Sequence, residues 1–319
     1  MSDVVMYRLA ARRWRGVAHP RGFTVVELLI ALIVGGVVAA SLVGVFRRQQ
    51  RFYVDAGVLL ANRVALRDAT GIIPGELRSL APPAGDVIAF SDSSLEIRAT
   101  IGAAVACDTV AGGDAIHLAP GTSPGVVMSP ILSAFTTAPE PGDLVLAFNA
   151  GAEDVARDDT WASLSVTDVS PGSGLCDASP FAASIPRGSA SVRLRFGAGE
   201  RAPPTVHPGA FVRVLRRVRY RFYRAGTGEW FLGYAEWNGA SFAPVQPVSG
   251  PFASYQVRGT SGLRFRYFDA AGAVLTAGDD PSRIARVEVT ARSATDRGVS
   301  GTGAIRPDSQ TVTIRVRNQ

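Results

Sequence analysis

A run of 24 residues from Phe23 to Phe46 contains only one charged side chain, that of Glu27. At about 1.5 Å per residue, a helix of this length is roughly 36 Å long, whereas the hydrocarbon layer of a bilayer is about 30 Å thick. Arg21 lies just before the run and Arg47 just after it. We therefore expect residues 23–46 to form a single transmembrane helix.

Two other interpretations of this run fit its length less well. A helix buried in the core of a globular protein is one alternative, but 24 residues without a polar face exceed what such a core normally needs. A cleaved secretory signal has an apolar region of about 7 to 15 residues that ends in small residues. Ala39, Ala40 and Ser41 resemble such an end, but the run is longer than a signal needs. An ordinary secreted domain would begin near Ser41 or Leu42 after processing.

A simple membrane anchor does not explain Glu27. A carboxylate within the hydrocarbon costs at least about 2.5 kcal/mol, so it requires a specific partner. If the chain is cut between Gly22 and Phe23, a new α-amino group lies four residues before Glu27. That amine would be one helical turn away, or at the same position on a neighbouring helix. Proteolysis would therefore create the countercharge.

The sequence around this cut resembles a known family. Residues 21–32, RGFTVVELLIAL, are similar to the class III signal of type IV prepilins and type II secretion pseudopilins. The resemblance implies that a prepilin peptidase removes residues 1–22 as a cytoplasmic leader by cutting after Gly22, and that it methylates the new N-terminus at Phe23. It also implies that Glu27 guides assembly by pairing with the N-terminal amine of a subunit.

The resemblance further implies a location and partners. The chain would cross the bacterial inner membrane with a cytoplasmic N-terminus and a periplasmic head, and would later enter a pilus or pseudopilus. Expected partners are prepilin peptidase, other pilin or pseudopilin subunits, the inner-membrane assembly platform and membrane lipid. A leader of 22 residues is longer than in many major pilins, and the C-terminal strands are similar to those of PilW-type minor pilins. We therefore expect a minor pilin or pseudopilin.

After the membrane segment, the sequence predicts an α+β fold with a stalk helix and a β-rich head. Residues 47–80 are expected to form the amphipathic stalk, and residues 81–319 the head. The apolar face of the stalk would consist of Tyr53, Ala56, Leu60 and Val64, which recur at helical spacing. Gly71 would cap this helix and Pro74 would prevent its continuation.

In the head, apolar and polar residues alternate, which is typical of antiparallel strands with one solvated face. The clearest alternation occurs at residues 217–222, 263–267, 286–289 and 312–317. Further strands are expected at residues 86–90, 95–101, 114–118, 144–148, 164–166 and 191–196. Asp269–Gly272 would form a hairpin turn.

The two cysteines, Cys107 and Cys176, both lie in the expected head. In an oxidising periplasm they are expected to form a disulfide, and two free buried thiols are the alternative. The sequence has no C-x-x-C pair and only three His. A four-ligand zinc site is therefore not expected, and no metal or cofactor is predicted.

Composition and motifs argue against an enzyme. All 33 basic residues are Arg, so no Walker A lysine, Schiff-base lysine or Ser-Lys dyad exists. Residues 121–125 match G-x-S-x-G, but prolines at 120 and 124 predict a loop instead of the strand-to-helix turn of a nucleophile elbow. The acid pairs Asp158–Asp159 and Asp279–Asp280 lack the spacing of an EF-hand loop and are expected to be solvated turns.

The charge leaves one alternative open. Of the net charge of +6, residues 1–22 account for +4, because five Arg there face one Asp. The strands nevertheless carry rows of Arg that could bind nucleic acid beside Trp230 and Trp237, namely Arg217, Arg219, Arg221, Arg264 and Arg266. We expect these rows to be the wet face of a sheet. The alternative function is a membrane-anchored adhesin or a DNA-binding pilin-like subunit.

Overall fold

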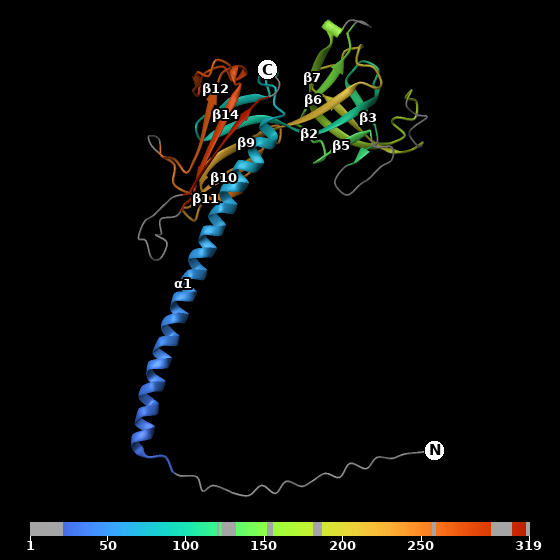
Figure 1. Cartoon of the computed structure of the whole chain (residues 1–319). Helices are drawn as coiled ribbons and strands as arrows, with labels where there is room; N and C mark the ends of the chain where they lie inside the picture. The colour runs from blue at the N-terminus through green and yellow to red at the C-terminus, as the bar shows by residue number, and fades with distance from the viewer. Residues whose placement is uncertain are drawn as a thin grey trace, which may run out of the picture. The chain divides into compact units, whose positions relative to one another are not determined.

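The computed structural model describes residues 22–119, 121–122, 132–151, 156–180, 187–256, 260–294 and 308–316 (Figure 1). It confirms the predicted α+β fold, with one long N-terminal helix and a head of mostly antiparallel strands. Residues 1–21 of the expected leader lie outside the described residues, as does most of the G-x-S-x-G match. The chain divides into two compact units, Met1–Asp55 and Ala56–Gln319.

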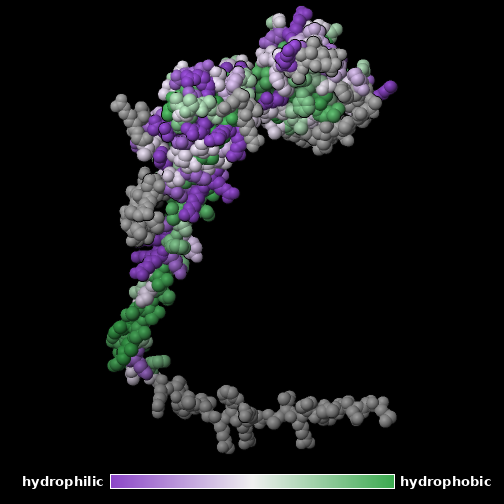
Figure 2. Space-filling model, turned by 45° about the horizontal axis from the view of Figure 1, so that its top comes forward, coloured by the Kyte–Doolittle hydropathy of each residue, from purple (hydrophilic) through white to green (hydrophobic). Residues whose placement is uncertain are grey.

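Helix α1 runs without interruption from Val25 to Leu77. Figure 2 shows hydrophobic side chains gathered on the N-terminal part of this helix. The prediction that Gly71 ends the stalk helix is wrong, because α1 passes through both Gly71 and Pro74. Pro74 is buried together with Ile73 and Leu77. We attribute its tolerance to this packing, which offsets the hydrogen bond that a proline nitrogen cannot donate.

The face of α1 that meets the head also differs from the predicted one. Tyr53, Leu60 and Val64 are 73%, 65% and 51% exposed. The buried stripe instead consists of Asn62, Ala65, Leu66, Ala69, Thr70, Ile73, Pro74 and Leu77. Within this contact, the Ser249 hydroxyl donates a 2.6 Å hydrogen bond to the Ala65 carbonyl. Apolar residues occur on several faces of this helix, so spacing alone did not identify the one that packs.

Part of the head is a closed antiparallel barrel. Its strands, in order of pairing, are β2 (Ser94–Thr109), β3 (Ala115–Leu118), β8 (Ala190–Phe196), β7 (Thr160–Ser173), β6 (Leu144–Asn149) and β9 (Phe211–Arg224). β9 pairs back with β2 and completes the ring. Closure of the ring leaves these strands without free edges. Apolar side chains such as Val145, Leu194 and Val212 fill the interior.

Beyond the barrel, β2 and β9 continue into an open sheet. β1 (Val87–Phe90) pairs with β2, while β10 (Trp230–Glu236) and β11 (Gln246–Phe252) extend the sheet from β9. The short strands β5 (Ser133–Phe135) and β4 (Gly121–Thr122) follow on β2. Short 3-10 helices are η1 (Pro82–Ala84), η2 (Ala156–Asp158) and η4 (Pro281–Arg283).

A second sheet has four strands in the order β13 (Val274–Leu275), β12 (Leu263–Phe268), β14 (Arg286–Arg292) and β15 (Ser309–Arg315). The buried stripe of α1, the open part of the large sheet and this second sheet share one hydrophobic core. Leu66 of α1, Val218 of β9 and Phe265 of β12 all belong to this core. The end of α1 is therefore an integral part of the head.

Arg216 separates the two cores along β9. Val214 belongs to the barrel core and Val218 to the core around α1. Arg216 is 3% exposed and donates to both oxygens of the Asp143 carboxylate, at 2.8 and 2.9 Å. It also donates to Glu236 Oε2 at 3.1 Å. These hydrogen bonds, foremost those to Asp143, raise the pKa of the guanidinium.

Each predicted strand overlaps an observed one. The predicted hairpin turn joins β12 to β13, and within it the Gly272 N–H donates a 3.0 Å hydrogen bond to the Asp269 carbonyl. Strands β10 and β11 were not predicted. Gly233 breaks the pattern of β10, while Pro247 and Pro251 obscure β11. β11 tolerates prolines because it lies at the edge of the sheet.

Candidate functional site

The expected cleavage site lies just before α1. Gly22, Phe23 and Thr24 have neither helical nor strand structure. Phe23 is 82% exposed, and nothing lies within 4 Å of the position where a side chain on Gly22 would begin. Exposed segments of this kind are the preferred sites of proteolysis. The local structure at the Gly22–Phe23 bond is therefore compatible with cleavage.

Glu27 lies in the first turn of α1 and forms a reciprocal cap with Thr24. The Glu27 N–H donates to Thr24 Oγ1 at 3.2 Å. In return, the Thr24 N–H and hydroxyl donate to Glu27 Oε2 at 3.2 and 3.3 Å. This arrangement is a capping box, which satisfies donors that the helix start leaves open. We did not predict it from the sequence, although the T-x-x-E spacing at residues 24–27 is its signature.

The rest of the segment is an apolar helical surface. Among the described residues, α1 is the one helix long and apolar enough to cross a membrane. Its large side chains between Val25 and Phe46 are all at least half exposed. A soluble domain rarely exposes so large an apolar surface, which instead suits a bilayer or the apolar helices of other subunits.

Comparison with protein-family models matches residues 18–43 to the prokaryotic N-terminal methylation motif. The chain carries a type IV prepilin-like class III signal. This prepilin-type segment spans the Gly22–Phe23 bond, the capping box and most of the apolar run. It fits a membrane-anchored precursor of a pilin or pseudopilin that is processed by prepilin peptidase. No curated protein and no solved structure matches significantly, so the likeness to PilW-type minor pilins stays a prediction.

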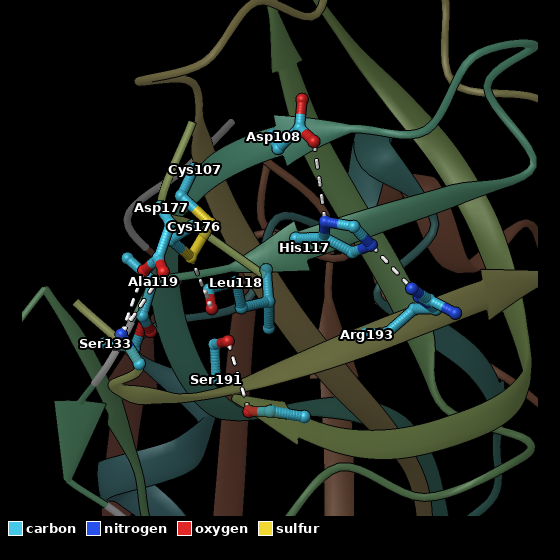
Figure 3. The surroundings of a disulfide bond; sticks show 12 residues. Cys107, Asp108, His117, Leu118, Ala119, Ser133, Cys176, Asp177, Ser191 and Arg193 are labelled. Atoms are coloured by element: carbon cyan, nitrogen blue, oxygen red, sulfur yellow. Dashed lines mark hydrogen bonds and ion pairs between the residues drawn. A yellow bond between two sulfur atoms is a disulfide. The ribbon is translucent and has the colours of Figure 1, made fainter. Parts of the chain in front are cut away.

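In the head, Cys107 and Cys176 form the expected disulfide, with their Cα atoms 5.4 Å apart (Figure 3). Cys107 lies near the end of β2, and Cys176 lies between β7 and β8. The disulfide therefore links the segment between β7 and β8 to β2. Both residues are buried against Ala119 in a small hydrophobic cluster.

His117 lies close to this disulfide, between Asp108 and Arg193 (Figure 3). Its Nε2 accepts a 3.0 Å hydrogen bond from Arg193 Nε, and its Nδ1 is 3.6 Å from Asp108 Oδ2. Burial, aided by the positive charge of Arg193, lowers the pKa of His117. Over the described ranges, no group of three or more His, Cys, Asp or Glu could hold a metal ion. The contacts of His117 with Arg193 and Asp108 link β3 to β8 and β2.

Two Arg of the predicted rows already have partners within the head. Arg217 and Arg219 both bind the Glu96 carboxylate, which receives 2.6 Å and 3.0 Å hydrogen bonds from their Nε atoms. Arg217 also lies 4.4 Å from the centre of the Trp237 ring, and Arg219 lies 3.8 Å from that of Phe242. These contacts leave the two guanidinium groups less available to the phosphates of a nucleic acid.

The Asp279–Asp280 pair shapes local backbone turns. Asp279 accepts a 2.7 Å hydrogen bond from the Thr276 N–H, and Asp280 accepts one of 2.9 Å from the Ser282 N–H. Hydrogen bonds from Thr276 and Ser282 lower the pKa values of the two carboxyls. Asp280 is also the N-cap of η4. The two side chains thus have structural partners of their own.

Proposed function

We propose that this protein is a minor pilin or pseudopilin, and that it acts by assembly, not by catalysis. Prepilin peptidase removes the leader and methylates Phe23, and the subunit then joins other subunits through its apolar helix. The prepilin-type segment supports this proposal most strongly, because it combines an exposed Gly22–Phe23 bond, an acid in the first helical turn and an apolar surface.

The geometry of the capping box suggests how Glu27 serves assembly. Both hydrogen bonds that it accepts from Thr24 reach Oε2. Oε1 can then accept from the Phe23 ammonium of the same or a neighbouring subunit. A carboxylate near a helix N-terminus is also stabilised by the helix dipole. The negative charge of Glu27 within the membrane is thereby balanced by both the Phe23 ammonium and the helix dipole.

The proposed location is the bacterial inner membrane, with a cytoplasmic leader and a periplasmic head that later joins a pilus or pseudopilus. The disulfide between Cys107 and Cys176 supports an oxidising compartment for the head, since such bonds are rare in the cytosol. Its partners on this proposal are other pilin-like subunits and the assembly platform of the inner membrane.

The first test is mass spectrometry of the mature protein purified from membranes. We expect an N-terminus at methylated Phe23. An N-terminus near Ser41 or Leu42 would instead identify a secreted domain, and a retained leader would contradict the proposal.

The second test separates the charge of Glu27 from its capping role. Glu27→Gln removes the charge but keeps an oxygen that can accept from Thr24, whereas Thr24→Val removes the capping hydroxyl and keeps the charge. Fibre fractions from sheared cells should lose the Glu27→Gln subunit, while Thr24→Val should lower helix stability by only about 1 kcal/mol and leave assembly largely intact. Equal incorporation of Glu27→Gln and the parent would refute the electrostatic mechanism.

A further inference from the structure

A cavity of about 460 Å³ lies on the outer wall of the barrel, beside η1. Leu144 and Leu146 of β6 contribute to its lining and point outward, because Val145 and Ala147 between and beyond them face the barrel interior. The size and the mainly apolar lining are those of sites that bind small molecules. The cavity lies in the head and shares no residue with the prepilin-type segment.

Trp161 of β7 provides an aromatic wall for this cavity. Its side chain is 45% exposed, which is unusual for so large an apolar group. The ring is supported on the neighbouring strand by Phe148, whose ring centre lies 5.5 Å away in an edge-to-face arrangement. Trp161 is therefore held in place while part of its surface stays free for a ligand.

Two Arg provide positive charge in the same cavity. Arg98 Nη1 donates to the Gly85 carbonyl at 2.9 Å, and Arg213 Nη2 donates to the Thr100 hydroxyl at 2.8 Å. In the described part of the chain, neither guanidinium has a nitrogen within 4.0 Å of a carboxylate oxygen. A guanidinium has five N–H donors, so each retains donors for an anionic group.

Asp86 adds an acceptor to the lining. It is 2% exposed and accepts a 2.9 Å hydrogen bond from the Ala81 N–H through Oδ2. Burial raises the pKa of this carboxyl, and the Ala81 hydrogen bond and the nearby charges of Arg213 and Arg98 oppose that rise. The cavity thus combines donors, an acceptor, an aromatic ring and an aliphatic floor.

We propose that this cavity binds a short acidic saccharide, of the class that contains hexuronate units. The C–H face of one sugar ring would stack on Trp161, its hydroxyls would donate to Asp86, and its carboxylate would accept from Arg98 and Arg213. A single-stranded DNA also offers rings and negative charge, but between its ends it has no free hydroxyl to donate to the Asp86 carboxylate. The mixed lining therefore favours the saccharide. This activity is additional to assembly and does not depend on it.

The test is isothermal titration calorimetry of the full chain in a detergent that has no sugar headgroup. The probes are the trisaccharide of galacturonic acid, the neutral trisaccharide of galactose and a short oligothymidylate. We expect the acidic trisaccharide to bind at least about tenfold more tightly than the neutral one, because only the former has carboxylates for the guanidinium groups.

Variants then locate the site. Trp161→Ala and Arg213→Gln should each weaken binding of the acidic trisaccharide about tenfold or more, and Trp161→Phe should retain most of it. The matched control is Arg221→Gln, which changes an exposed Arg on the same strand as Arg213 but outside the cavity. Circular dichroism checks that every variant is folded.

Three results would overturn the proposal. The first is no heat of binding for the acidic trisaccharide at millimolar concentration, and the second is equal affinity for the neutral one. The third is tighter binding of oligothymidylate that depends on Trp161, which would identify a nucleic-acid site. Assembly assays remain independent of all three, since Glu27 and the apolar helix lie outside the cavity.

Discussion

Arg216 is the residue whose replacement we expect to destabilise the head most clearly. Its side chain is almost fully buried and donates to the Asp143 carboxylate, to Glu236 Oε2 and, at 2.9 Å, to the Ala138 carbonyl. The Asp143 carboxylate is 2% exposed, and in Arg216→Met it would keep the 2.8 Å hydrogen bond from the Glu140 N–H as its remaining side-chain hydrogen bond among the described residues. It would become a buried charge without a counterion.

The expected cost of this change is about 3 to 5 kcal/mol of unfolding free energy, the range found when one partner of a buried ion pair is removed. The assay is urea unfolding of the full chain in detergent, followed by tryptophan fluorescence. Arg221→Met is the control, because Arg221 is an exposed Arg on the same strand, and it should change the unfolding free energy by less than about 0.5 kcal/mol.

A double variant tests whether the cost comes from the uncompensated carboxylate. Arg216→Met with Asp143→Asn removes both charges, so it should recover at least half of the stability lost in Arg216→Met alone. The reasoning fails if Arg216→Met costs less than about 1 kcal/mol. It also fails if the costs of the two single substitutions simply add in the double variant.

Three further predictions concern other parts of the chain. Burial raises the pKa of Glu76 above its ordinary value of 4.5, so the folded state binds this proton more tightly than the unfolded state does. The free energy of unfolding therefore falls as the pH rises above 4.5. Glu76→Gln should raise the urea midpoint of unfolding at pH 7 but not at pH 4. Gly35→Ala with Gly36→Ala should leave the isolated subunit at least as stable, because apart from the adjacent residues and the local helix backbone no atom lies within 4 Å of either added methyl. Any loss of assembly would then report contact with neighbouring helices. Reduction of the Cys107–Cys176 bond, which closes a loop with a sequence separation of 69, should cost about 4 kcal/mol in urea unfolding, and a parent that unfolds equally with and without reductant would contradict this.

The N-terminal part of the molecule was accessible from sequence because its signals are local. An apolar run predicts a membrane helix from its length alone, and an acid within that run stands out at once. The capping role of Glu27 is equally local, because the T-x-x-E spacing that begins at Thr24 is the signature of a capping box.

The head was accessible only in part, because its organisation depends on pairing between distant residues. Alternation located the strands, but it did not show that β2 and β9 are long enough to serve both the barrel and the open sheet. Closure of the barrel requires β9 to pair with both β6 and β2, which no local pattern encodes. The buried Arg216 is similar, since in the sequence it is one Arg among several in a row.

Helix α1 separates the surface that we propose for assembly from the surface that packs into the head. The apolar run ends at Phe46, and the stripe that packs into the head begins at Asn62. Assembly through the first surface and folding of the head through the second therefore use different residues of one continuous helix. Substitutions before Phe46 should change incorporation without changing the unfolding of the head, whereas substitutions such as Leu66→Ala should destabilise the head by about 2 to 5 kcal/mol. An assay of both properties on the same variants would show whether assembly and the stability of the head are independent.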